Sequence, residues 1–344
     1  MSRLRARATI DRNVGAVLVL VAIFAPLIFN TYWIGTLLTD ALILGILAAT
    51  LIFLSAYGGM VSLAQVALYG IAAFAIGNLT TTGNTKGLNL GWSPLAAVPV
   101  AILVTLLMGL LFGVLARRSF GIYFLMITLT FGVIANLFFG EVTTVSGFGG
   151  ISGIPTPTII GNPAQHPARL YFVALVLALA VYALLRYLAR TPFGLTLQGI
   201  RDDPVRMASL GYNVSLHRTL VFGAMSAVAG VGGILFAWWN GHVDPATINI
   251  GNSINVLIIA VIGGLSRLEG AWIGALVFVI LNNYAQQISF VSSRFETLIG
   301  VIFLVIVLLS PDGLTGLWAR AIDLLRTSRK QVPAADPGGG SPAN

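Results

Sequence analysis

The sequence predicts an all-α membrane protein that crosses the bilayer about ten times. Of its residues 57% are hydrophobic and only 9% are charged, whereas soluble domains average roughly 25% charged residues. The apolar residues form runs close to the roughly 20 residues that a helix needs to span a bilayer. Most basic residues lie at the ends of these runs. A water-soluble fold of 344 residues could not bury so much apolar surface.

Ten runs qualify as candidate spans, and they cover residues 14–35, 37–57, 60–79, 93–116, 121–139, 168–188, 219–239, 253–266, 270–288 and 297–317. The first run follows a basic segment, as in a signal peptide, but it is long and lacks a small-x-small cleavage site, so we interpret it as a retained span. The apolar part of the eighth run, 254–265, is short enough for a re-entrant segment. A crossing is still favoured, because its omission would place the basic C-terminal tail outside.

The distribution of Lys and Arg predicts the orientation of these spans. With the N-terminus in the cytoplasm, sixteen of the nineteen basic residues fall on the cytoplasmic side, and the exceptions are Lys86, Arg169 and Arg294. Basic residues are enriched in cytoplasmic loops of membrane proteins. We therefore expect both termini to be cytoplasmic.

The segments between the spans indicate a single membrane domain. Residues 80–92 and 141–167 are expected as external loops, and the second is dense in Gly and Pro and is expected to cap the external face. Residues 1–330 form the predicted single membrane domain, and 331–344 form a predicted disordered tail. No tandem repeat is visible, while a diverged inverted repeat stays open.

Several classes of chemistry are disfavoured by what the sequence lacks. It has no Cys, and its three His are scattered, so we expect neither disulfides nor a metal site, and no cofactor. A phosphate-binding Gly-x4-Gly-Lys-[Ser/Thr] loop is also lacking. The basic residues mark helix ends and do not form a nucleic-acid patch. The chain is not expected to be an enzyme.

The polar segment 190–218 carries clear helix signals. Asp203 is placed to cap a short helix, Pro204 suits its first turn, and Gly211 suits a left-handed C-terminal position. These residues predict a helix over 204–210. Such a short helix can dock a soluble partner or rest on lipid headgroups, and spacing alone leaves both open.

Five sequence blocks are distinctive: YGGMVSLAQ at 57–65, FGIYF at 120–124, GISGIP at 150–155, TPFGLTLQGIRDD at 191–203 continuing to ASLG at 208–211, and VIGG at 261–264. In this order they resemble the LivM-type permeases of branched-chain amino-acid ABC transporters. Ala64 replaces the usual Gly of the first block. The external block has GFGG at 147–150, where the family often has a paired Gly-Pro-Asn-Gly stretch.

This resemblance implies a subunit of the bacterial inner membrane that pairs with a second permease. It also implies two ATP-binding subunits docked on the cytoplasmic loops and an external solute-binding protein. The residues expected to couple the ATPases to the spans are Gly199, Arg201, Asp202, Asp203, Pro204, Ala208, Leu210 and Gly211.

Few polar residues lie inside the spans, and none is a central ionisable group, which disfavours proton coupling. Sodium coupling through backbone carbonyls stays open. Candidate residues of a translocation path are Gln65, Thr128, Asn136 and Asn255. The alternative for each is a helix-to-helix hydrogen bond. Arg267 and Glu269, at an inner turn, are expected to pair.

Three other functions remain open from the sequence. A permease for a sugar or another small polar solute would share the same architecture. An ion-coupled secondary carrier would transport without partners, and a membrane scaffold would dock no ATPase at 190–218.

Overall fold

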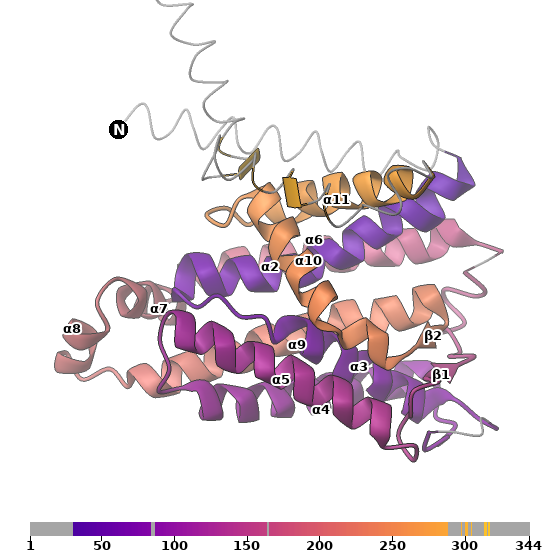
Figure 1. The fold of residues 1–344 in the computed structure, drawn as a ribbon, viewed down its shortest axis with the longest axis horizontal. Coiled ribbons are helices and arrows are strands. Elements are labelled where there is room, and N and C mark those ends of the chain that lie inside the picture. Colours follow the sequence, from indigo (N-terminus) through magenta and orange to yellow (C-terminus); the bar gives the residue numbers. More distant parts are fainter. Residues whose placement is uncertain are drawn as a thin grey trace, which may run out of the picture.

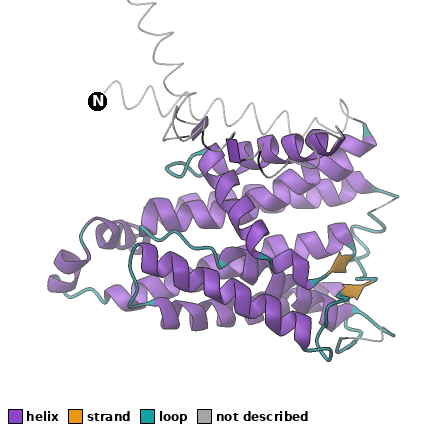
Figure 2. Ribbon diagram, viewed as in Figure 1, coloured by secondary structure: helices purple, strands orange, loops and turns teal. Residues whose placement is uncertain are grey.

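The computed structural model describes residues 30–83, 87–163 and 165–287, and the isolated positions 297, 300, 301, 304, 313, 314 and 316. Within these residues the fold is helical apart from one two-stranded ribbon (Figure 2). The predicted all-α membrane architecture is confirmed. Most of the first and tenth predicted spans, and the predicted tail 331–344, lie outside the described residues.

The helices are the π-helix η1 Trp33–Leu38, α2 Thr39–Gly58, α3 Gln65–Thr80, α4 Pro94–Ala116, α5 Ile122–Glu141, α6 Pro167–Arg190, α7 Pro192–Asp202, α8 Pro204–Ser209, α9 Val214–Asn240, the 3-10 helix η2 Pro245–Ile248, α10 Ile250–Gly263 and α11 Gly270–Gln287. Strands β1 Ile151–Ser152 and β2 His242–Val243 pair antiparallel. Among the described residues, five helical stretches are long and apolar enough to cross a membrane, whereas α3, α10 and α11 are shorter.

Helices α2 and α9 pack together at the centre of the bundle. Helices α3 and α4 lie along α9, and α11 lies along α2, with α6 packed on α2 from outside. The short helices α7 and α8 project from one end of the bundle, and the β ribbon lies at the opposite end (Figure 1).

Several of these helices approach one another to backbone contact. A Cβ atom built at Gly233 of α9 would lie 2.0 Å from the carbonyl oxygen of Tyr69 in α3, and one at Gly274 of α11 would lie 2.1 Å from that of Ile259 in α10. Small residues at membrane interfaces allow such approaches. Glycine at these positions therefore sets the helix spacing.

Helices α2 and α9, which precede the short helices α3 and α10, both end at a glycine in the left-handed conformation. Gly59 after α2 has φ +62°, and Gly241 after α9 has φ +66°, a left-handed conformation that glycine adopts without strain. After each glycine the chain runs without regular α-helix before α3 or α10 begins. We call residues 59–64 the first junction and residues 241–249 the second junction.

The short helices do not reach across a bilayer. Helix α3 has 16 residues and α10 has 14, which gives lengths of roughly 24 and 21 Å at 1.5 Å per residue, against about 30 Å for a bilayer core. The first junction lies at the α7 end of the bundle and the second at the ribbon end (Figure 1). Helix alone therefore does not suffice for a crossing at α3 or α10.

The two junctions are alike in sequence and in the packing of the helices around them. The first reads GMVSLAQ over 59–65 and the second GHVDPAT over 241–247, with the same residue at the Gly, Val and Ala positions. Helix α3 packs on α4 as α10 packs on α11, and α4 lies along α9 as α11 lies along α2. These similarities are those expected of an inverted repeat, which the sequence left open.

Several predicted boundaries were wrong. The expected break between the first two spans at residue 36 falls inside a continuous helix, Trp33–Gly58. The third span begins as a helix only at Gln65, because 60–64 is non-helical chain. The seventh begins at Val214, where the side chain of Asn213 caps the helix by accepting a hydrogen bond from Leu216 N at 3.0 Å.

Two further predictions about the polar turns need correction. Residues 192–202 form helix α7, which the sequence analysis did not anticipate, since their apolar residues are sparse. Glu269 pairs with Arg186 of α6, at 3.4 Å, and not with Arg267.

The close approach of α3 and α9 predicts the effect of a methyl group. Gly233→Ala must push the two backbones apart, so we expect a loss of about 1–3 kcal/mol, as for other overpacked cores. Gly132→Ala is the matched control, because nothing lies within 4 Å of its added Cβ. Thermal unfolding in detergent should show a lower midpoint only for Gly233→Ala. Equal midpoints for both variants would contradict the packing.

Candidate functional site

A cavity of 430 Å³ lies where the second junction meets α2, α3, α10 and α11. Its polar lining comes from the second junction and from α10 and α11, and consists of Asp244, Thr247, Asn249, Asn252, Asn255 and Asn282. Its apolar lining includes Leu44, Leu47, Val66, Val256, Ile259 and Phe278. One cavity thus offers both hydrogen-bonding and aliphatic surfaces.

The polar wall is held by hydrogen bonds within the second junction. The Asp244 carboxylate accepts from the backbone N–H and the hydroxyl of Thr247, at 3.1 and 3.2 Å. Asn249 caps α10 by accepting from Asn252 N at 2.7 Å. The Asn252 amide in turn donates to the carbonyls of Ala246 and Thr247. This wall is therefore ordered before any solute arrives.

Helix α5 forms side-chain hydrogen bonds to the backbone of both junctions. The hydroxyl of Thr128 accepts a hydrogen bond from Leu63 N in the first junction, at 3.2 Å. Eight residues later, the amide of Asn136 donates to the carbonyl of Pro245 in the second junction, at 2.6 Å. These bonds satisfy backbone groups that non-helical chain would otherwise leave unpaired inside a membrane.

Gln65 lies at the end of the first junction and is fully buried. Neither its amide nitrogen nor its amide oxygen has a hydrogen-bond partner among the described residues. A buried unpaired polar group costs about 1–3 kcal/mol.

The structure divides the four sequence-predicted path residues between the junctions. Gln65 and Thr128 lie at the first junction, Asn136 lies at the second, and only Asn255 lines the cavity. Sequence reasoning missed Asn249 and Asn252, although their spacing before an apolar run is typical of a helix start.

The segment 190–218 contains the predicted short helix. The Asp203 carboxylate caps α8 by accepting from Arg206 N at 2.9 Å, Pro204 occupies the first position, and Gly211 has φ +90°. The helix ends at Ser209, one residue earlier than predicted, and the backbone N–H of Gly211 bonds to Ala208 O.

Helix α8 has no buried residue. The side chains of Val205 and Leu210 are 75% and 65% exposed. Gly199 lets α8 pack on α7, because a Cβ there would lie 2.8 Å from the sulfur of Met207. The segment therefore presents an ordered but uncovered helix at one end of the bundle.

Two arginines connect this segment to the first junction. Arg201 donates to the carbonyl of Ala56 in the last turn of α2, and its guanidinium also pairs with Asp202 at 2.7 Å. Arg218 is buried in the first turns of α9, where it donates to the Ser119 carbonyl at 2.8 Å and contacts the sulfur of Met60 at 3.2 Å.

Arg218 also stacks on the aromatic block at the start of α5. Its guanidinium carbon lies 4.1 Å from the ring centroid of Phe120 and 5.3 Å from that of Phe124, the geometry of a cation–π contact. Sequence analysis treated Arg218 only as the end of a loop. Its position next to an apolar run was the signal that it is partly buried.

Broken helices around a half-polar cavity, in an apolar bundle with an exposed helix at one end, define a membrane transport component. The chain belongs to the family described as branched-chain amino acid transport system / permease component, whose model matches residues 33–308. No solved structure matches the chain.

Curated relatives agree with this assignment. The high-affinity branched-chain amino acid transport system permease protein LivM of Escherichia coli K12 is 27% identical over 83% of this chain and 70% of its own length. The LivM protein of Salmonella typhimurium is 27% identical over 63% and 56%. A probable branched-chain amino acid transport permease protein LivH of Methanocaldococcus jannaschii is 29% identical over 46% and 50%.

The bond from Thr128 to the first junction predicts a local effect. Thr128→Val leaves the N–H of Leu63 unpaired, so we expect a loss of about 1–3 kcal/mol and faster amide exchange in 59–65. Thr130→Val is the matched control, because that hydroxyl bonds only to Met126 O within its own helix. Hydrogen exchange measured by mass spectrometry should separate the two variants. Unchanged protection of 59–65 in Thr128→Val would contradict the assigned contact.

Proposed function

We propose that this chain is one of two permease subunits of an ATP-driven importer for branched-chain or related amino acids. It forms half of the translocation path. The cavity at the second junction carries this proposal, because its lining suits an aliphatic zwitterion. The family membership and the names of the relatives support it.

The two sides of the cavity match the two ends of such a solute. Leu44, Leu47 and Ile259 offer an aliphatic surface, and the asparagines at the start of α10 offer amide donors and acceptors. Asp244 offers a carboxylate to an ammonium group, and the start of a helix favours a carboxylate. These contacts are few, which suits a subunit that passes on a solute selected elsewhere.

The two junctions act as alternating gates on this path. The second junction borders an open cavity, while Ser62 and Gln65 at the first are fully buried. The unpaired amide of Gln65 is the group that the solute meets when the first junction opens. In this alternating scheme, Thr128 stabilises the first gate and Asn136 stabilises the second, each through its hydrogen bond to the junction.

The exposed helix α8 is the docking element for an ATP-binding subunit, with Gly199, Asp203, Pro204, Ala208, Leu210 and Gly211 shaping it. Arg201 and Arg218 carry its movement to the first junction. The basic residues at this end support a position in the cytoplasm of a bacterial cell, with both chain termini on the same side. A second permease and an external solute-binding protein complete the importer, and 1–330 is its membrane domain.

The docking role predicts an uncoupled variant. Gly211→Val strains a backbone with φ +90° that a β-branched residue adopts poorly, so α8 should be misplaced. In the assembled transporter we expect solute-stimulated ATP hydrolysis and uptake to fall at least about tenfold, a coupling loss of roughly 1.4 kcal/mol.

Gly83→Val is the control for this substitution. It also has a positive φ, with open space around its Cβ, and lies in the loop at the opposite end. Membrane insertion should survive in both variants. Normal coupled uptake in Gly211→Val would refute the coupling role of α8.

A further inference from the structure

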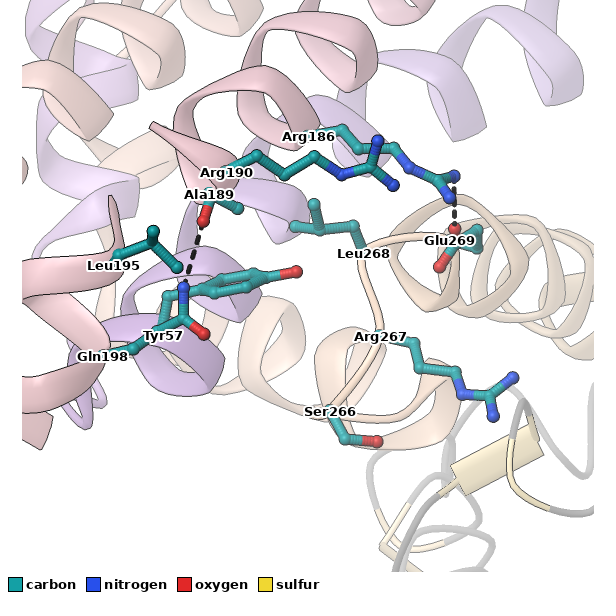
Figure 3. A pocket seen from close by; sticks show the side chains of 10 residues that line it. All are labelled: Tyr57, Arg186, Ala189, Arg190, Leu195, Gln198, Ser266, Arg267, Leu268 and Glu269. Carbon is teal, nitrogen blue, oxygen red and sulfur yellow. Dashed lines mark hydrogen bonds and ion pairs between the residues drawn. The ribbon is translucent and has the colours of Figure 1, made fainter. Parts of the chain in front are cut away.

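A second cavity, of 470 Å³, lies at the end of the bundle that carries α7 (Figure 3). It is lined by the last residues of α2 and α6, by α7, and by the turn between α10 and α11. Because these are the ends of membrane-crossing helices, the cavity lies at the depth of lipid headgroups. Neither the solute path nor the docking helix α8 contributes to it.

The charges in this pocket are unbalanced. Arg186, Arg190 and Arg267 line it together with a single acid, Glu269. Glu269 is already engaged, since it accepts from the hydroxyl of Tyr182 at 2.6 Å and pairs with Arg186 at 3.4 Å. Among the residues that the structure describes, the pocket therefore keeps two positive charges, those of Arg190 and Arg267, without a counter-charge.

The remaining donors that line the pocket belong to different elements. Arg190 extends from α6 beside Arg186, and Arg267 extends from the turn on the other side of Leu268 (Figure 3). The phenol oxygen of Tyr57 also points into the pocket (Figure 3). Among the described residues, no hydrogen bond or ion pair joins the side chain of Tyr57, Arg190 or Arg267 to another residue.

Apolar surface continues from the pocket along the membrane-facing side. Leu195 and Leu268 belong to its lining. On α6, Leu184 and Tyr187 are 50% and 69% exposed, as expected for side chains that face lipid. Basic pockets between helices at the cytoplasmic end of a bundle suit anionic headgroups.

We propose that this pocket binds one phosphate-bearing anion, and that in the membrane this anion is the headgroup of an anionic phospholipid. Arg190 and Arg267 contact the phosphate, and Tyr57 donates to it. The acyl chains lie along α6. Lipid binding in this pocket requires only the residues at the helix ends and does not require transport. It can therefore be tested separately from the proposed function.

The test uses the full chain, purified in detergent and titrated with phosphatidylglycerol or with phosphatidylcholine under native mass spectrometry. We expect the wild type to prefer phosphatidylglycerol. The double variant Arg190→Gln/Arg267→Gln should bind it on the order of tenfold more weakly, since each basic residue near a headgroup contributes appreciably. Both side chains are exposed, so the fold should persist.

The double variant Arg117→Gln/Arg118→Gln is the matched control. It removes two exposed arginines from the end of α4, outside the pocket, and should keep binding within about twofold of the wild type, because it leaves the local field of the pocket intact. Glu269→Gln keeps an acceptor for Tyr182 but removes the acid. It should therefore strengthen phosphatidylglycerol binding.

Three results would overturn the proposal. Equal losses in both double variants would indicate unspecific surface charge. Displacement by millimolar inorganic phosphate, without preference between the two lipids, would indicate a soluble anion. If Arg190→Gln/Arg267→Gln kept lipid binding but lost the ATP-binding subunits on copurification, the pocket would be a protein-docking site.

Discussion

Hydrogen bonding of backbone groups inside the bilayer constrains the rest of this structure. Non-helical chain at membrane depth is tolerated only where protein or a water-filled cavity satisfies its N–H and C=O groups. Both junctions meet this condition through α5, which reaches the first with Thr128 and the second with Asn136. One straight helix therefore stabilises the two places where the crossing helices are broken.

Two glycines set where the helices break, and two arginines contact the chain around the first break. Gly59 and Gly241 end α2 and α9 in the same left-handed conformation, which turns the chain back into the bundle. Arg218 at the start of α9 contacts Met60 of the first junction, and Arg201 of α7 bonds to Ala56 in the last turn of α2, just before that junction. The elements on either side of α8 thus contact the first junction and the helix that leads into it.

The sequence predicted the features that follow from local chemistry. Asp203, Pro204 and Gly211 predicted α8 because capping and turn preferences act over a few residues, and the apolar runs predicted the membrane-spanning helices. The first junction was missed because residues 60–64 are as apolar as a helix, and hydropathy does not distinguish buried non-helical chain from helix. The pairing of Arg186 with Glu269 joins residues 83 positions apart, which no local pattern indicates.

The account rests on the two junctions opening in turn, and thiol accessibility tests this most directly. The chain has no Cys, so Asn252→Cys and Ser62→Cys can be placed singly in a transporter reconstituted with cysteine-free partners. An impermeant reagent on the external side should label position 252 in the resting state but not after trapping with ATP and vanadate. Position 62 should become reactive only from the nucleotide side, and only when trapped. Labelling of position 252 that is the same in both states, or labelling of position 62 from outside, would contradict the account.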